Sequence, residues 1–267
     1  MFGLLRDIWH YRGFVQGSIR REIATQYRGS LLGAMWVLIG PTVMILIYTL
    51  VFSHLMQSRL TGVDSAFGYG IFLCAGLLPW TLFTESITRL QAVFVTNSNL
   101  MKKAMFPRIC LPVIALGTAG FNFAVIGSLF LVFLFLAGKF PGLIMVAALP
   151  ALVVQVALAM GLGMLFATLN VFFRDVGQAV TLALQFWFWL TPIVYPLSSL
   201  PTWAQPVIAW NPMAVLVSHY QAVVLYRRLP DAGSWLSLGA VAGLALFSLW
   251  LGLAMYRRRV GELVDEL

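Results

Sequence analysis

The chain has 267 residues, of which 61% are hydrophobic and only 10% are charged, and its mean hydropathy is +0.91. Since a soluble domain carries about 25% charged residues, this composition excludes an ordinary soluble fold and indicates a polytopic membrane protein. The formal net charge is +8, but the basic residues stand between apolar runs, where they act as topology signals rather than as a nucleic-acid-binding surface. Long uncharged runs without strict alternation predict membrane-spanning helices rather than a β-barrel.

The residues that could carry catalytic or metal chemistry are scattered along the sequence. Cys74 and Cys110 stand in or beside apolar runs without C-x-x-C spacing, and His10, His54 and His219 have no ligand-forming neighbours in sequence. Cysteines of this kind are usually buried small side chains. The chain also lacks a G-x-x-x-x-G-K-[ST] loop, an H-E-x-x-H motif and a pair of carboxylates suited to acid–base catalysis. We therefore expect no catalytic residue, no metal site and no cofactor on this chain.

Residues 1–31 predict an amphipathic helix followed by a junction. Apolar residues from Leu4 to Ile23 recur at helical spacing, and basic and polar residues occupy the opposite face. This pattern is typical of a helix that lies in the membrane interface. We expect it on the cytoplasmic side, before the first span.

The first span is expected at residues 32–56, where an uncharged run exceeds the ~20 apolar residues that cross a bilayer. Pro41 is expected to bend it. Its stripe of Thr42, Thr49 and Ser53 fits either a helix-packing seam or a pathway wall.

Three further spans are expected at residues 66–98, 109–137 and 143–172. In the span at 66–98 the uncharged run ends at Glu85 and Arg89. The residues that follow are amphipathic, and we expect them to continue the helix into the cytoplasm. The basic segment 99–108 then follows as a candidate contact for a soluble partner. A Gly/Pro-rich turn at residues 138–142 predicts an antiparallel hairpin of the next two spans.

Residues 176–226 carry no charge, which is too long a run for one span, and they include five prolines. Two topologies fit: one span at 176–195 followed by re-entrant short helices at 196–226, or two full spans. The positive-inside rule barely distinguishes them, whereas the prolines favour the re-entrant arrangement, which tolerates non-helical backbone beside a cavity. A last span at 235–256 ends in Arg257–Arg259, so the expected fold is all-α with six spans and both termini in the cytoplasm.

A polar stripe that runs into aromatic residues marks the expected fifth span. Gln178, Thr181, Gln185 and Trp189 share one helical face. This face fits a wet pathway for a ligand that stacks on rings and accepts hydrogen bonds, such as a sugar, and it equally fits a packing face with an interfacial aromatic belt. The candidate pathway residues are Thr42, Thr49, Ser53, Gln178, Thr181, Gln185, Phe188, Trp189 and Tyr195, and the candidate gate residues are Pro192, Pro196, Asn211 and Pro212.

The middle of every expected span lacks a charged residue. Proton- and ion-coupled carriers keep ionisable groups at this depth, where each one costs free energy and must therefore have a use. We expect the energy for transport to come from a partner.

Several motifs follow one another in a fixed order along the chain. They are an arginine at Arg21, YRGSLLGAMW from Tyr27 with Pro41 after it, LLPWTLFTESI from Leu77, NLMKKAMFPRICLP from Asn99, FRD from Phe173, TPIVYP from Thr191 and the pair Asn211-Pro212. This ordered set resembles the membrane subunit of type-2 ABC exporters, most of all the permeases that export O-antigen, capsular polysaccharide and teichoic acid. The resemblance covers nearly the whole chain, with Thr191 at a position where serine is more usual.

The resemblance implies a homodimer in the bacterial inner membrane, bound to two copies of a separate ATPase subunit that holds ATP and Mg²⁺. It implies that a lipid-linked, undecaprenyl-type polysaccharide is the exported substrate and that this chain is a permease rather than an enzyme. The residues that the resemblance assigns to the ATPase interface are Arg20, Arg21, Arg28, Asn99, Met101, Lys102, Lys103, Phe106 and Arg108.

Two alternatives stay open at this point. A type-2 exporter of a drug or a small lipid would share the fold, but the FPR and YRGSLLG motifs disfavour it. An integral membrane glycosyl- or acyltransferase would need acidic or histidine groups at the interface, and the chain has few of them.

Overall fold

The computed structural model describes residues 6, 9–26, 35, 39–47, 67–103 and 107–266, and all regular elements among them are helical. Four of these helices are long and apolar enough to cross a membrane. They are α4 (Gly68–Thr96), α6 (Cys110–Leu136), α7 (Leu149–Phe172) with the 3-10 helix η3 (Gly142–Ala148) before it, and α11 (Ala232–Arg259). The all-α membrane architecture is confirmed. The expected first span falls mostly outside the described residues, although residues 39–47 are helical.

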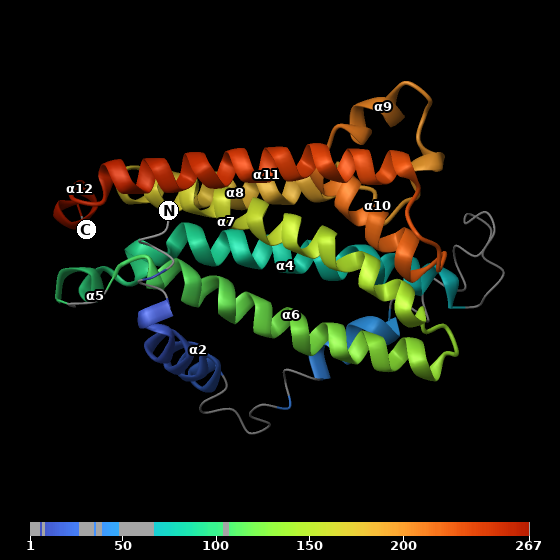
Figure 1. Ribbon diagram of the computed structural model, residues 1–267, viewed down its shortest axis with the longest axis horizontal. Helices are drawn as coiled ribbons and strands as arrows, with labels where there is room; N and C mark the ends of the chain where they lie inside the picture. The colour runs from blue at the N-terminus through green and yellow to red at the C-terminus, as the bar shows by residue number, and fades with distance from the viewer. Residues whose placement is uncertain are drawn as a thin grey trace.

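The long helices lie side by side in the order α6, α4, α7 and α11 (Figure 1). Helix α8 (Asp175–Trp189) lies beside α4 and α7, and α10 (Pro212–Val224) packs on α4 and α11. Two short helices, α5 (Ser98–Lys103) and α12 (Glu262–Asp265), lie at one end of the bundle, which we call the α5 end (Figure 1). The amphipathic helix α2 (Arg12–Gln26) packs on α6, and α9 (Ala204–Ala209) lies at the opposite end.

Glycines allow the long helices to approach closely. A Cβ atom on Gly161 of α7 would lie 2.4 Å from the backbone nitrogen of Leu249 on α11, and one on Gly252 would lie 2.6 Å from the carbonyl oxygen of Gly161. Gly163 faces α4 in the same way, because its Cβ would lie 2.4 Å from Leu90. Lipid tails are as apolar as leucine, so close packing at small residues stabilises membrane helices where the hydrophobic effect does not.

The turn between α6 and η3 is formed at the Gly/Pro-rich residues, where Gly138 and Gly142 both have a φ of +66°. Glycine adopts this left-handed conformation without the steric cost that a Cβ brings. Helices α6 and α7 run in opposite directions, but they contact each other little, and each packs on α4 (Figure 1). Helix α4 therefore lies between the two helices of this hairpin, and α7 also packs on α11.

Helix α8 ends at Trp189, whereas the span was expected to continue to residue 195. The chain turns at Leu190 because Pro192 and Pro196 have no backbone N–H to continue the helix. At a rise of 1.5 Å per residue, the 15 residues of α8 extend about 22 Å, less than the ~30 Å hydrocarbon core. The described helices thus do not reach six full spans.

Candidate functional site

A groove of about 410 Å³ runs between α4 and α8. Residues one helical turn apart form each wall, so the groove follows one face of each helix. The wall from α4 consists of Trp80, Thr84 and Thr88, and the wall from α8 consists of Thr181, Leu184, Gln185, Phe188 and Trp189.

The aromatic residues of the groove are held by neighbouring rings. Trp80 lies 5.7 Å from Phe188 between ring centroids, and its edge contacts Trp187 at 6.5 Å. Trp187 in turn packs edge-to-face on Phe83 at 5.3 Å. Trp189 is 65% exposed. The groove therefore offers an accessible ring beside a rigid aromatic wall, which suits stacking on a ring-shaped ligand.

Two hydroxyl groups of the groove already donate to their own helices. Thr84 donates to the carbonyl oxygen of Trp80 at 3.0 Å, and Thr181 donates to that of Gly177 at 2.9 Å. Their oxygen lone pairs are then left to accept hydrogen bonds, and the amide of Gln185 can both donate and accept. A ligand rich in hydroxyl groups has matching partners here.

The structure brings together four of the expected pathway residues: Thr181, Gln185, Phe188 and Trp189. Gln178 is exposed on α8 outside the groove lining, and Thr42 is exposed on the helical residues 39–47. Thr49 and Ser53 lie outside the described residues. Tyr195 does not line the groove; its hydroxyl donates to the carbonyl oxygen of Trp189 at 2.7 Å and so ties the turn to the end of α8.

The expected gate residues form a turn that Asn211 holds in place. Its side-chain oxygen accepts from the Trp187 indole N–H at 2.8 Å and from the backbone N–H of Met213 at 3.0 Å. Its amide nitrogen donates to the carbonyl oxygen of Leu190 at 3.0 Å and to the Thr191 hydroxyl at 3.1 Å. Asn211 thus caps α10 and fastens the end of α8.

The prolines of this turn take fixed places around Asn211. Pro192 is buried, and Gln221 donates to its carbonyl oxygen at 3.4 Å. Pro196 precedes the short 3-10 helix η4 (Leu197–Ser199), and Pro212 begins α10, where its missing N–H costs nothing. Tyr69 of α4 adds a hydrogen bond to the carbonyl oxygen of Val194. The gate role of these residues remains a prediction.

The expected ATPase-binding residues are divided between exposed and buried positions. Arg20 and Arg21 are exposed on α2, and Asn99 and Lys102 are exposed on α5. Lys103 ends α5. Arg28 and Phe106 lie outside the described residues.

Met101 and Arg108 differ from the expected exposed contacts. Met101 is only 2% exposed and packs in a cluster with Leu263 of α12, which is fully buried. Arg108 is partly buried and donates to the carbonyl oxygen of Val260 at 3.3 Å. Because α5 turns Met101 towards this cluster, the residue anchors the segment and is not available as a surface contact. The segment after α11 thereby supports α5.

Comparison with known proteins identifies the family. The profile of the ABC-2 type transporter family matches residues 15–225, which is most of the chain. The chain belongs to the ABC-2 type transporter family. In this ABC-2 transporter the groove, the Asn211 turn and α5 all lie within the matched residues.

The names of three curated relatives of this ABC-2 transporter refer to the export or transport of polysaccharides. It is 31% identical over the full length of both chains to the O-antigen export system permease protein RfbA of Myxococcus xanthus. It is 31% identical over 78% of its length, and 79% of the relative, to the protein of the same name from Klebsiella pneumoniae. The polysialic acid transport protein KpsM of Escherichia coli is 22% identical over 92% of this chain and 93% of its own.

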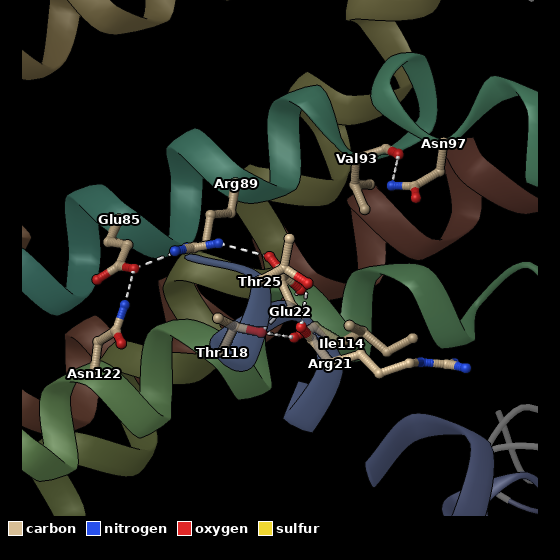
Figure 2. A network of polar contacts seen from close by, with 10 residues as sticks. All are labelled: Arg21, Glu22, Thr25, Glu85, Arg89, Val93, Asn97, Ile114, Thr118 and Asn122. Atoms are coloured by element: carbon tan, nitrogen blue, oxygen red, sulfur yellow. Dashed lines mark hydrogen bonds and ion pairs between the residues drawn. The ribbon is translucent and has the colours of Figure 1, made fainter. Parts of the chain in front are cut away.

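A polar network between α2, α4 and α6 was not predicted from the sequence of this ABC-2 transporter. Arg89 of α4 contacts Glu22 of α2 and Glu85 of α4, each at 2.8 Å (Figure 2). Asn122 of α6 donates to Glu85 at 2.6 Å, and Thr118 of α6 donates to Glu22 at 3.0 Å. The four-residue spacing of Glu85 and Arg89 was a visible signal, but nothing local connects either of them to Glu22.

Glu85 and Asn122 lie about midway along helices α4 and α6. Helix α4 is continuous from Gly68 to Thr96, so Leu82 is its middle residue and Glu85 lies within one turn of it. Asn122 lies next to Phe123, the middle residue of α6. Arg89 and Asn122 both bind the Glu85 carboxylate. The expectation that the middle of each span lacks a charged residue stays a prediction.

Proposed function

We propose that this chain is the transmembrane subunit of an ATP-driven exporter that moves a lipid-linked polysaccharide of the O-antigen or capsular type across the bacterial inner membrane. The observation that carries this proposal is the α4–α8 groove, where hydroxyl and amide groups lie beside an exposed tryptophan. Sugars present hydroxyl groups at their edges and apolar C–H faces that stack on aromatic rings. The relatives named for O-antigen and polysialic acid transport support the same substrate class.

The chain is proposed to act as a homodimer, and the groove gives a physical reason. The exposed side of α8 carries Thr181 and Gln185 beside its apolar residues. Polar groups that face lipid without partners are costly. A second copy of the chain would cover this side and close the groove into a pathway, with the Asn211 turn as a gate at its end.

The energy is proposed to come from two copies of a separate ABC ATPase, which would bind ATP and Mg²⁺. Among the described residues, the carboxylates of Glu22 and Glu85 are engaged by Arg89 and by hydrogen bonds. This pairing favours a structural role for them over ion transport. The exposed basic residues of α2 and α5 offer a surface for the partner, with Arg20, Arg21 and Lys102 among them.

The proposal is tested with vesicles that contain the chain, an ABC ATPase from the same organism and a radiolabelled lipid-linked glycan. We expect glycan transport that requires ATP and that falls about fivefold or more on Trp189→Ala, by analogy with the stacking of nucleic-acid bases on aromatic side chains, where each contact contributes about 1–3 kcal/mol. Phe186→Ala is the matched control, because Phe186 is 70% exposed on the same helix but does not line the groove. Transport of a small drug or lipid instead of glycan, or wild-type glycan transport by Trp189→Ala, contradicts the proposal.

A further inference from the structure

The amphipathic helix α2 is attached to the bundle by two different kinds of contact. On the α6 side it packs closely: Val15 lies in a buried cluster with Cys110 and Ile114, and Ile19 fits over Gly117, where a Cβ atom would lie 2.5 Å from its side chain. These contacts fix α2 against α6 by shape. A Cβ atom at residue 117 would force the end of the Ile19 side chain to move.

On the α4 side, a cavity of about 510 Å³ separates α2 from α4. Phe14, Ser18 and Arg21 line it from α2, and Ala92 and Thr96 line it from α4. The ion pair between Glu22 and Arg89 crosses from one helix to the other beside this cavity (Figure 2). Charge therefore joins α2 to α4 where apolar packing does not.

We propose that the Glu22–Arg89 ion pair is a latch that transmits movement of α2 to α4. This inference rests on the proposed function, because it assigns the movement of α2 to the ATPase. One guanidinium serves two carboxylates, and the side chains of Arg89, Glu85 and Glu22 are only 25%, 29% and 40% exposed. Separating Glu22 from Arg89 would cost the attraction between two only partly solvated charges and one of the two ion pairs of the guanidinium. A displacement of α2 thus carries Arg89 with it instead of breaking the pair.

Glu85 and Asn122 give the latch its second half. Glu85 accepts a hydrogen bond from the Nε of Arg89 and another from Asn122 of α6 (Figure 2). The guanidinium is therefore fixed to α4 directly and to α6 through Glu85. The cavity beside Arg89 gives α2 room to shift without a clash. Glu22, Arg89 and Glu85 are therefore positioning residues that join the interface helix to the centre of the bundle.

The chain itself offers a matched pair of variants. Glu22→Gln and Glu85→Gln are the same chemical change, and each leaves Arg89 with one carboxylate, so the charge of the network is equal in both. Only Glu22→Gln removes the ionic contact between α2 and α4. We expect Glu22→Gln to raise the ratio of ATP hydrolysed to glycan exported roughly three- to tenfold, the effect of losing one or two polar contacts between membrane helices. In Glu85→Gln the increase in this ratio should be less than about half of the increase in Glu22→Gln.

Equal effects of the two variants, or wild-type coupling in Glu22→Gln, overturn the proposal. If Glu22→Gln does not insert, the uncharged variant Glu22→Gln/Glu85→Gln/Arg89→Gln replaces it, because replacing a whole ion-pair set is often neutral for stability. If this variant hydrolyses as much ATP per exported glycan as the wild-type chain, or if it fails to insert, the network is purely structural and the latch is also overturned.

A second measurement does not depend on the exported substrate. Val15 of α2 is 7% exposed and faces α6. In a chain whose native Cys110, in the same cluster, is replaced by alanine, a cysteine at residue 15 reacts with a maleimide only when α2 leaves the bundle. In the isolated chain we expect Glu22→Gln to speed this labelling roughly threefold and Glu85→Gln to leave it nearly unchanged. If the wild-type chain exports no glycan but labelling follows this order, the proposed function fails and the attachment of α2 stands; equal labelling rates contradict the latch.

Discussion

Two polar networks stabilise this transporter, and they differ in charge. At the turn after α8, Asn211 uses its oxygen and its amide nitrogen in four hydrogen bonds between neutral groups. Where α2 meets α4, Arg89 joins two carboxylates instead. A neutral hydrogen bond depends steeply on distance and angle, whereas the attraction between charges falls slowly with distance. The first network therefore suits a fixed turn, and the second suits two helices that stay attached while they move.

The largest effect is expected for Arg89→Met. It leaves the carboxylates of Glu22 and Glu85 close together without a cation, and like charges that are only partly exposed to solvent repel each other and destabilise the fold. We expect a strongly lowered midpoint of thermal unfolding in detergent and poor membrane insertion. Arg228→Met is the control, since Arg228 is exposed and stacks on Tyr226. An unfolding midpoint equal to that of the control would show that the charged network contributes no stability.

A smaller loss is expected for Asn211→Ala, which removes the neutral network. The Trp187 N–H and the Thr191 hydroxyl lose a partner, and an unsatisfied buried group costs about 1–3 kcal/mol. The midpoint of thermal unfolding should fall less than in Arg89→Met. Gln205→Ala is the control, because it removes one hydrogen bond, to Leu200, from the same region. Equal midpoints for Asn211→Ala and Gln205→Ala would contradict the central position of Asn211.

Added salt should distinguish the two networks, because it weakens the charged one and not the neutral one, and neither network needs to be mutated. At 1 M salt the Debye length falls to about 3 Å, so the partly exposed Glu22–Arg89 pair weakens while neutral hydrogen bonds do not. We expect added salt to speed maleimide labelling of a cysteine at Val15. Labelling of a cysteine at Ile193, which is fully buried in the Asn211 turn, should not change. The same salt dependence at both positions would remove the distinction.

The smallest effect concerns Asp231, the N-cap of α11. The hydrogen bonds from the Ser234 hydroxyl and then from its backbone N–H lower the pKa of this exposed carboxyl. A lowered pKa in the folded state means that ionisation of the cap contributes its full stability above the ordinary value near 3.9, and that this contribution is lost as the pH falls from there through the lowered pKa. Asp231→Ala should therefore lower the unfolding midpoint slightly at pH 7, and by progressively less as the pH falls below about 4. A difference between the two chains that does not shrink with falling pH in this range would contradict the prediction.

The long helices could be predicted because charged residues mark both ends of the uncharged runs in the sequence. The uncharged runs at 109–137 and 143–172 nearly coincide with α6 and with η3 plus α7. The polar face of α8 was visible for the same reason, since residues 181, 185 and 189 recur at helical spacing. Four of its expected pathway residues do meet in one groove.

The partners across helices could not be predicted. Glu22 and Arg89 are 67 residues apart, and Asn211 meets Trp187 at a distance of 24 residues. Helical periodicity assigns a side chain to a face but does not say which helix that face meets. For this reason Trp80, Thr84 and Thr88 of the groove were missed, and Met101 was expected on a surface although it is buried.

The central claim is that the polysaccharide passes along the groove between α4 and α8. The most direct test places a cysteine at Gln185, attaches a bulky maleimide and measures ATP-dependent glycan export with the native ATPase bound; the same label at Phe186 is the control. Native Cys74 and Cys110 are buried and should not react. We predict that the label at Gln185 stops export while the label at Phe186 permits it. Export that continues with Gln185 fully labelled would contradict the claim.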